Sequence, residues 1–191
     1  AATPPLEGLK LLFSLGMSEE PEFGKSDPDC YMVLDVRRAH FHSPATRDSV
    51  FVKLCAEDNV EGLELCARLL KSMYGTRDAA VNWERFYSAV MNKLGFVSGV
   101  ANPCLFYRKS HNQRAFVHGD DFVISGKRKE LLELHKELGK DMELKFRGIL
   151  GPRPDLGDIQ EIIILNRIVR FTDGGIPPLS SGKPIRGMQR L

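Results

Sequence analysis

Three segments of the chain space their apolar residues three or four positions apart, and this spacing predicts helices. The clearest one begins after Asp78, a residue suited to capping a helix start, and finishes at Gly95, a residue suited to ending one. Its apolar residues form one stripe, which indicates a helix with one buried face. The predicted helices cover residues 6–15, 78–95 and 127–140.

Short runs of β-branched and aromatic residues predict strands between these helices. The predicted strands cover residues 31–36, 50–54, 104–109, 114–118, 122–126 and 159–171. Residues 63–70 suit a strand or a helix equally. The polar residues 16–30 indicate a loop, and the Gly-, Pro- and Ser-rich residues from 174 onward indicate a poorly ordered tail.

This order of elements predicts the α+β class. A strand, a helix, a hairpin, a second helix and a last strand match the β-α-β-β-α-β motif. We therefore expect a ferredoxin-like core: an antiparallel sheet with helices 78–95 and 127–140 packed on one face.

The composition is that of an ordinary globular domain. The chain has 191 residues, 42% of them hydrophobic, and a net charge of +2, which permits nucleic-acid binding without arguing for it.

None of the four cysteines forms a C-x-x-C pair, so we expect reduced thiols in an intracellular compartment, cytoplasmic or nuclear, and no zinc site. No apolar run approaches the roughly 20 residues that span a bilayer, and the start lacks the features of a secretion signal. The chain begins without Met, which suggests a fragment of a longer protein.

Two adjacent acids, Asp120 and Asp121, lie between apolar runs in the segment VHGDDFVISG. A hairpin turn explains them most simply, because Gly and Asp tolerate positive φ, but a bound cation could also offset their repulsion. Asp35 ends the predicted strand 31–36, and a hairpin beside that strand would bring three carboxylates to one sheet edge. Such carboxylates suit Mg²⁺, and two ions about 4 Å apart can activate a hydroxyl and stabilise a leaving pyrophosphate. The backbone carbonyl of Val36 is a further candidate ligand.

Four segments carry motifs that can be compared with known families. They are LDVRRAHFHS followed by VFVKL, then LLKSMYGTRDAAVNWERFYSAVMNKLGF, NPCLFYRK and VHGDDFVISG. In this order they resemble the copia-type retrotransposon reverse transcriptases over about residues 31–140. The resemblance implies a polymerase palm over residues 31–171, preceded by a remnant of the fingers side in residues 1–30 and followed by a tail in residues 172–191.

The resemblance implies an RNA-directed DNA polymerase that works by two-metal nucleotidyl transfer. Asp35, Asp120 and Asp121 would be its catalytic acids and would hold two Mg²⁺ ions, which Mn²⁺ could replace. The substrates would be an RNA or DNA template–primer and deoxynucleoside triphosphates. The partners would be the other parts of a Pol polyprotein, namely fingers, thumb and ribonuclease H, and we expect no membrane contact.

The resemblance also implies which residues surround the incoming nucleotide. Tyr74 and Gly75 would border its pocket, and Arg77 matches the family's Lys near the template or the nucleotide. Five residues after the first catalytic acid, the family usually has an aromatic that blocks a ribose 2′-hydroxyl. This chain has His40 there, followed by Phe41, and either side chain could face the sugar.

Two other functions are compatible with the sequence. A Gly-Asp-Asp hairpin also marks RNA-dependent RNA polymerases, but those enzymes usually carry a second acid where this chain has His40. A non-catalytic relic would bind nucleic acid through a basic surface and would need no metal site. The residues of that surface would be Arg37, Arg38, Arg77 and Lys127–Lys129.

Overall fold

The structure, a computed structural model, describes residues 6–18, 29–48, 50–58, 60, 63, 65–172 and 176. The chain divides into two compact units. The hairpin unit comprises Arg38–Val90, and the sheet unit comprises the described residues of Ala2–Arg37 and Met91–Leu191. Within the described ranges, no helix combines the length and the apolar character that crossing a membrane requires.

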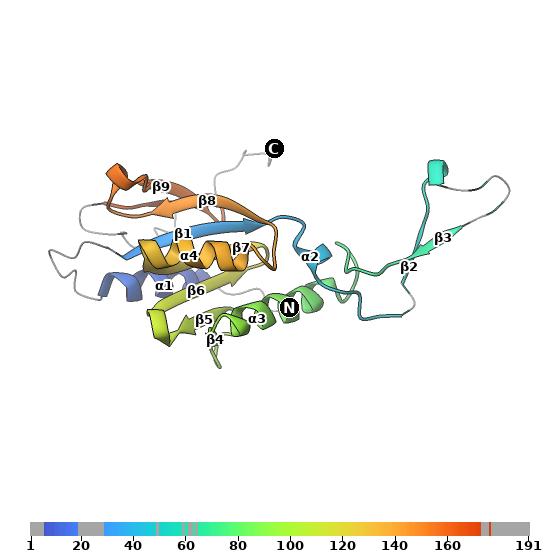
Figure 1. Ribbon diagram of the computed structural model, residues 1–191, viewed down its shortest axis with the longest axis horizontal. Helices are drawn as coiled ribbons and strands as arrows, with labels where there is room; N and C mark the ends of the chain where they lie inside the picture. The colour runs from blue at the N-terminus through green and yellow to red at the C-terminus, as the bar shows by residue number, and fades with distance from the viewer. Residues whose placement is uncertain are drawn as a thin grey trace. The chain divides into compact units, whose positions relative to one another are not determined.

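The sheet unit is built on an antiparallel sheet of six strands in the order β4-β5-β6-β7-β1-β8 (Figure 1). The strands are β1 (Asp29–Val36), β4 (Val97–Ser98), β5 (Leu105–Arg108), β6 (Gln113–His118), β7 (Asp121–Lys127) and β8 (Leu144–Leu150). The central strands β1 and β7 are buried along most of their length, which explains why their sequences are continuous apolar runs. The α+β class is therefore confirmed, while a palm with helices 78–95 and 127–140 on one face stays a prediction.

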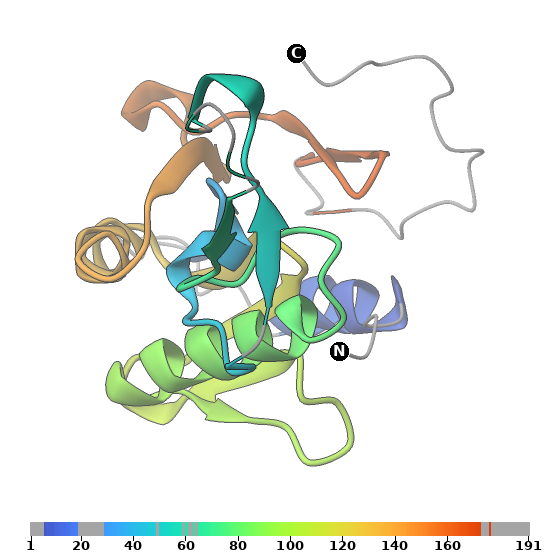
Figure 2. The same cartoon turned by 90° about the vertical axis from the view of Figure 1, so that its right-hand side faces the viewer.

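Helices α1 (Leu6–Ser18) and α4 (Arg128–Leu138) pack on opposite faces of this sheet (Figure 2). Successive side chains of a strand point to opposite faces. On one face, Tyr31 belongs to the same buried cluster as Leu9 of α1. On the other face, Leu131 of α4 lies over Gly126, the register partner of Cys30. The leucines that α4 buries are those that its spacing predicts: Leu131, Leu134 and Leu138.

A second, two-stranded sheet corrects one prediction. The single strand predicted over residues 159–171 is wrong, because β9 (Glu161–Ile164) and β10 (Arg167–Arg170) form an antiparallel hairpin there. Leu165 and Asn166 make its two-residue turn with φ of 48° and 60°. Two positive φ values are typical of the turns that match the twist of paired strands. The apolar residues on both sides of the turn hide it in the sequence.

Strand β8 was not predicted from the sequence. It pairs with β1, and the register shifts by one residue between Val33 and Leu34, whose partners are Gly148 and Phe146. Arg147 is the extra residue of this β-bulge. Only the second half of β8 is buried, so its sequence lacks the apolar run that reveals β1 and β7. The two-residue strand β4 was missed as well.

The hairpin unit contains α2 (Ala39–His42), β2 (Phe51–Lys53), β3 (Cys66–Arg68) and most of α3 (Ala79–Lys93). Strands β2 and β3 pair antiparallel, which shows that the ambiguous residues 63–70 contribute a strand. Helix α3 confirms the helix predicted over residues 78–95. The described residues also form short 3-10 helices, which are η1 (Ala56–Asp58), η2 (Lys109–His111) and η3 (Pro154–Leu156).

The ends of the chain are described only in part. Residues 16–18 belong to α1 and residues 29–30 to β1, so the loop predicted over residues 16–30 is wrong at both ends. The rest of that prediction, residues 19–28, lies outside the described residues. Of the predicted tail, residues 172–191, the structure describes Thr172 and Ile176, and Ile176 is buried. The rest of that prediction lies outside the described residues.

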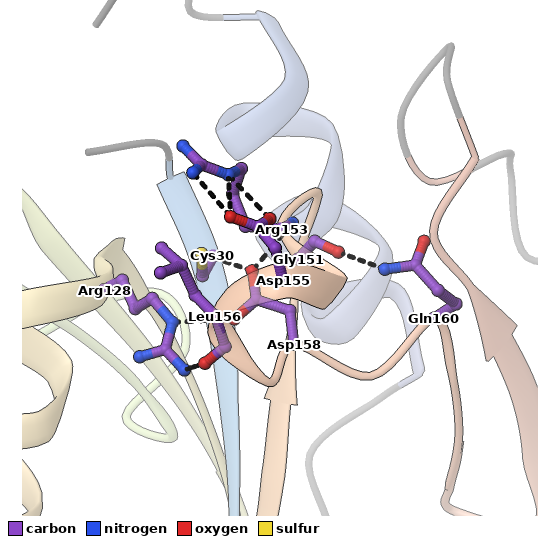
Figure 3. A network of polar contacts seen from close by, with 8 residues as sticks. All are labelled: Cys30, Arg128, Gly151, Arg153, Asp155, Leu156, Asp158 and Gln160. Atoms are coloured by element: carbon purple, nitrogen blue, oxygen red, sulfur yellow. Dashed lines mark hydrogen bonds and ion pairs between the residues drawn. The ribbon is translucent and has the colours of Figure 1, made fainter. Parts of the chain in front are cut away.

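A buried ion pair fixes the loop between β8 and β9 (Figure 3). Asp158, whose side chain is fully buried, accepts a hydrogen bond of 2.9 Å from Arg128 Nε and one of 3.0 Å from the backbone N–H of Arg153. The Cys30 thiol lies 3.8 Å from the same carboxylate. Arg128 also donates to the carbonyl of Leu156. The start of α4, the loop and β1 are thus joined through one carboxylate.

Candidate active site

Asp35 and Asp121 lie directly opposite each other at one edge of the sheet. They are register partners in the antiparallel pair β1–β7. Directly opposite residues project to the same face, with Cβ atoms about 5 Å apart. The sequence predicted that a hairpin beside the first strand would bring acids together, and the register brings these two together.

Asp120 occupies the turn that joins β6 to β7. His118 and Asp121 are register partners, so Gly119 and Asp120 form a two-residue hairpin turn. Gly119 has a φ of +63°, which explains its presence there. The backbone N–H of Val36 donates a hydrogen bond of 2.8 Å to the carbonyl of Asp120, which ties this turn to the end of β1.

Basic residues of β8 face the acids. The Arg147 Nη1 atom lies 3.6 Å from Asp121 Oδ1, and the two side chains are 29% and 13% exposed. Arg147 also donates a hydrogen bond of 2.7 Å to the carbonyl of Ile163 in β9. Lys145 is the register partner of Asp35. Positive charge on β8 therefore offsets part of the repulsion between the acids, a contribution that the sequence analysis missed.

The donor chemistry of this edge suits a hard divalent cation, because carboxylate oxygens are the ligands that Mg²⁺ prefers. Among the described residues, however, no group of three His, Cys, Asp or Glu side chains is arranged to hold a metal ion. Asp35 and Asp121 share a face, and Asp121 is engaged by Arg147. The three-acid ligand set with Asp120 therefore stays a prediction.

Other predicted site residues gather within the hairpin unit, around Tyr74. The His40 ring lies edge-on to the Tyr74 ring at 4.3 Å between centroids, and the Phe41 ring lies 5.9 Å away. His40 Nδ1 is 3.2 Å from the carbonyl oxygen of Ala79, to which it donates when it carries the proton. Gly75 follows with a φ of +87°, a conformation that favours glycine. His40 is thus held from two sides, whereas Phe41 is exposed.

Three of the six residues of the predicted basic surface lie beside acidic partners. Arg37 lies 3.6 Å from Glu143, and Lys127 lies 3.0 Å from Asp29. Arg128 is committed to the buried Asp158. These pairings reduce the charge that the surface would present to nucleic acid. Arg38, Arg77 and Lys129 are exposed.

This chain is similar to one family of known proteins, by a family model and by a curated relative. The family model described as reverse transcriptase (RNA-dependent DNA polymerase) matches residues 8–162. The retrovirus-related Pol polyprotein from transposon TNT 1-94 of Nicotiana tabacum is 25% identical over 142 residues. That alignment covers 72% of this chain and 10% of the relative, so the chain spans only a small part of the length of this curated protein.

Proposed function

Since the chain belongs to the reverse transcriptase (RNA-dependent DNA polymerase) family, we propose that it is the polymerase palm of a retrotransposon Pol polyprotein. The palm would extend over residues 31–171. The observation that carries the proposal is the register of Asp35 opposite Asp121, because it brings two strand-end carboxylates to one face of the sheet.

Asp35, Asp120 and Asp121 would be the catalytic residues. Two Mg²⁺ ions, or Mn²⁺ in their place, would activate the primer 3′-hydroxyl and stabilise the leaving pyrophosphate when bound. The three carboxylates and the Val36 carbonyl would supply the oxygen ligands. Catalysis would depend on positioning and electrostatics, and no side chain would form a covalent bond with the substrate.

The substrates would be a template–primer and a deoxynucleoside triphosphate. Tyr74 and Gly75 would border the nucleotide, with Arg77 near it or the template. His40 is the better candidate to exclude a 2′-hydroxyl, because a steric gate needs a side chain that is held in place. Fingers, thumb and ribonuclease H regions of a Pol polyprotein would be the partners.

A non-catalytic nucleic-acid-binding module is the second candidate. The observation that favours it is the ion pair between Arg147 and Asp121, which occupies one of the carboxylates that catalysis would need. In this alternative the acids would serve only the fold of the hairpin.

Primer extension on an RNA template, first with Mg²⁺ and then with Mn²⁺, tests the proposal. The variant is the double substitution Asp120→Asn, Asp121→Asn. The matched control is Asp48→Asn, Asp155→Asn, which removes two exposed carboxylates elsewhere. We expect the control to extend the primer and the variant to lose about 100-fold or more in rate, as loss of charge stabilisation at a reacting centre does.

The other outcomes are equally informative. Equal extension by the variant and the unsubstituted chain would refute the catalytic assignment. Absence of extension from every chain, with oligonucleotide binding retained, would favour the non-catalytic module.

A further inference from the structure

Three arginines line an open pocket that lies wholly within the hairpin unit. Its volume is about 410 Å³, within the range of roughly 300–1,000 Å³ that is typical of ligand sites. The lining residues are Thr46, Arg47, Arg77, Asp78, Val81, Asn82 and Arg85. The reverse transcriptase resemblance pointed only to Arg77 among the arginines.

The pocket is built on the start of α3. Four of the lining residues share one face of this helix, because they lie three or four positions apart along it. They are Asp78, Val81, Asn82 and Arg85. The segment between α2 and β2 supplies the opposite wall through Thr46 and Arg47.

A hydrogen-bond network holds this wall to the helix. The Thr46 hydroxyl lies 3.1 Å from an Asp78 carboxylate oxygen and 3.0 Å from the Asn82 side-chain oxygen. The Asn82 amide donates at 3.1 Å to Asp78 and at 3.1 Å to the Ser72 hydroxyl. Asn82 is only 4% exposed, so this network is part of the fold and shapes the pocket in advance of any ligand.

Asp78 supplies the only carboxylate among the lining residues. Burial by itself would raise the pKa of Asp78. Hydrogen bonds from the backbone of Asp78 and from the side chains of Thr46 and Asn82 lower it, as does the charge of Arg47. Together they outweigh burial, so the pKa of Asp78 is lower than usual. Its carboxylate is therefore ionised at neutral pH and already used by Thr46 and Asn82.

The pocket carries a surplus of positive charge. The lining contains three guanidinium groups and one carboxylate. In the part of the chain that the structure describes, neither the Arg77 nor the Arg85 side chain forms a hydrogen bond or an ion pair. The dipole of α3 adds positive potential at its start, where the pocket lies. A guanidinium presents paired donors that match the oxygens of a phosphate.

We propose that Arg47, Arg77 and Arg85 form a phosphate-binding pocket. The preference for phosphate follows from the pocket itself, and the assignment of that phosphate to a polynucleotide backbone rests on the proposed function. A free nucleoside triphosphate would present the same chemistry, so the experiment has an arm for each source.

Binding measurements on the full chain test the pocket. The variant is Arg77→Gln, Arg85→Gln, and the control is Arg68→Gln, Arg170→Gln, which removes the same charge from exposed arginines outside the pocket. The probes are a fluorescein-labelled single-stranded oligothymidylate and inorganic tripolyphosphate. Thermal unfolding of both variants checks that they fold.

We expect the pocket variant to lose about 10-fold or more in oligothymidylate affinity relative to the control. The slope of log affinity against log salt should fall by about 0.7 for each phosphate that the variant no longer neutralises. A loss confined to tripolyphosphate would keep the phosphate site and assign it to a free nucleotide. Equal affinities of variant and control for both probes would overturn the proposal. Because no probe is extended, this result is independent of the primer-extension test.

Discussion

Arg147 links Asp121 of β7 to the hairpin that follows β8. It occupies the extra position of a β-bulge, and bulges re-aim side chains that a regular strand would direct elsewhere. From there it reaches both Asp121 and the carbonyl of Ile163. Its charge substitutes for part of what a cation would supply at the acidic edge.

Replacing Arg147 with Gln should therefore make the stability of the folded chain depend more strongly on the concentration of divalent cations. Without the guanidinium, Asp35 and Asp121 repel each other more, and we expect the free energy of unfolding to fall by about 1 kcal/mol without metal. Added Mg²⁺ should then raise the thermal midpoint more in the variant than in the unsubstituted chain, because a ligand of the folded state stabilises it. Thermal unfolding with and without Mg²⁺ measures both effects.

Arg153→Gln is the matched control, because it removes an exposed arginine with its own acidic partner, Asp155. A Mg²⁺ shift of equal size in the two variants would contradict the role assigned to Arg147.

At the scale of the elements, the loop from β8 to β9 is held by one buried residue, Asp158. Asp158 receives a guanidinium from α4 and a backbone N–H from its own loop (Figure 3). Removing one member of a buried ion pair leaves the other charged, desolvated and uncompensated.

Asp158→Asn should accordingly lower the free energy of unfolding by about 3–5 kcal/mol, because the largely buried Arg128 loses its counter-charge. Denaturant unfolding measures the change. Asp155→Asn alters an exposed pair in the same loop and should lower it by less than about 1 kcal/mol. Similar losses of unfolding free energy in the two variants would contradict the prediction that the buried pair stabilises the fold more than the exposed pair does.

The packing of α4 against β8 should make stability depend on pH. The His135 ring lies 5.1 Å from the Phe146 ring, and burial lowers the pKa of His135 below its ordinary value of 6.5. As the pH falls through 6.5, the unfolded chain takes up a proton before the folded chain does, so the free energy of unfolding falls. Above 6.5 the residue is neutral in both states and makes no difference.

His135→Gln should flatten this decline, and denaturant unfolding at a series of pH values on both sides of 6.5 measures it. His111→Gln, in the turn between β5 and β6, is the control. An unchanged pH dependence in the His135 variant would contradict the prediction.

At the scale of the whole molecule, local pattern predicted helices and central strands but not their irregular connections. α3 and α4 have one apolar face, and β1 and β7 have long apolar runs, so single-sequence periodicity identifies them. The half-exposed β8 and the turn at Leu165 and Asn166 lack such a pattern. Strand β8 depends on pairing with β1, which lies far earlier in the sequence, whereas the turn joins two neighbouring strands whose apolar residues read as one run.

The candidate site shows the same division. The pairing of Asp35 with Asp121 was foreseeable, because one acid ends a buried strand and the other starts a hairpin strand. Arg147 was not, since only the register shift between β1 and β8 directs it to the acids. The pocket arginines come from two segments that only the folded chain brings together.

The register of Asp35 with Asp121 also bears on how the chain can change in length. The hairpin unit, residues 38–90, is inserted in the chain between these two acids, so pairing them closes a large loop. The entropy of loop closure grows only with the logarithm of loop length, by about 0.6 kcal/mol for each doubling. Insertions or deletions at the tip of that unit should therefore leave the pairing of the acids almost unaffected. Evolution can resize the inserted segment while the acidic edge keeps its geometry.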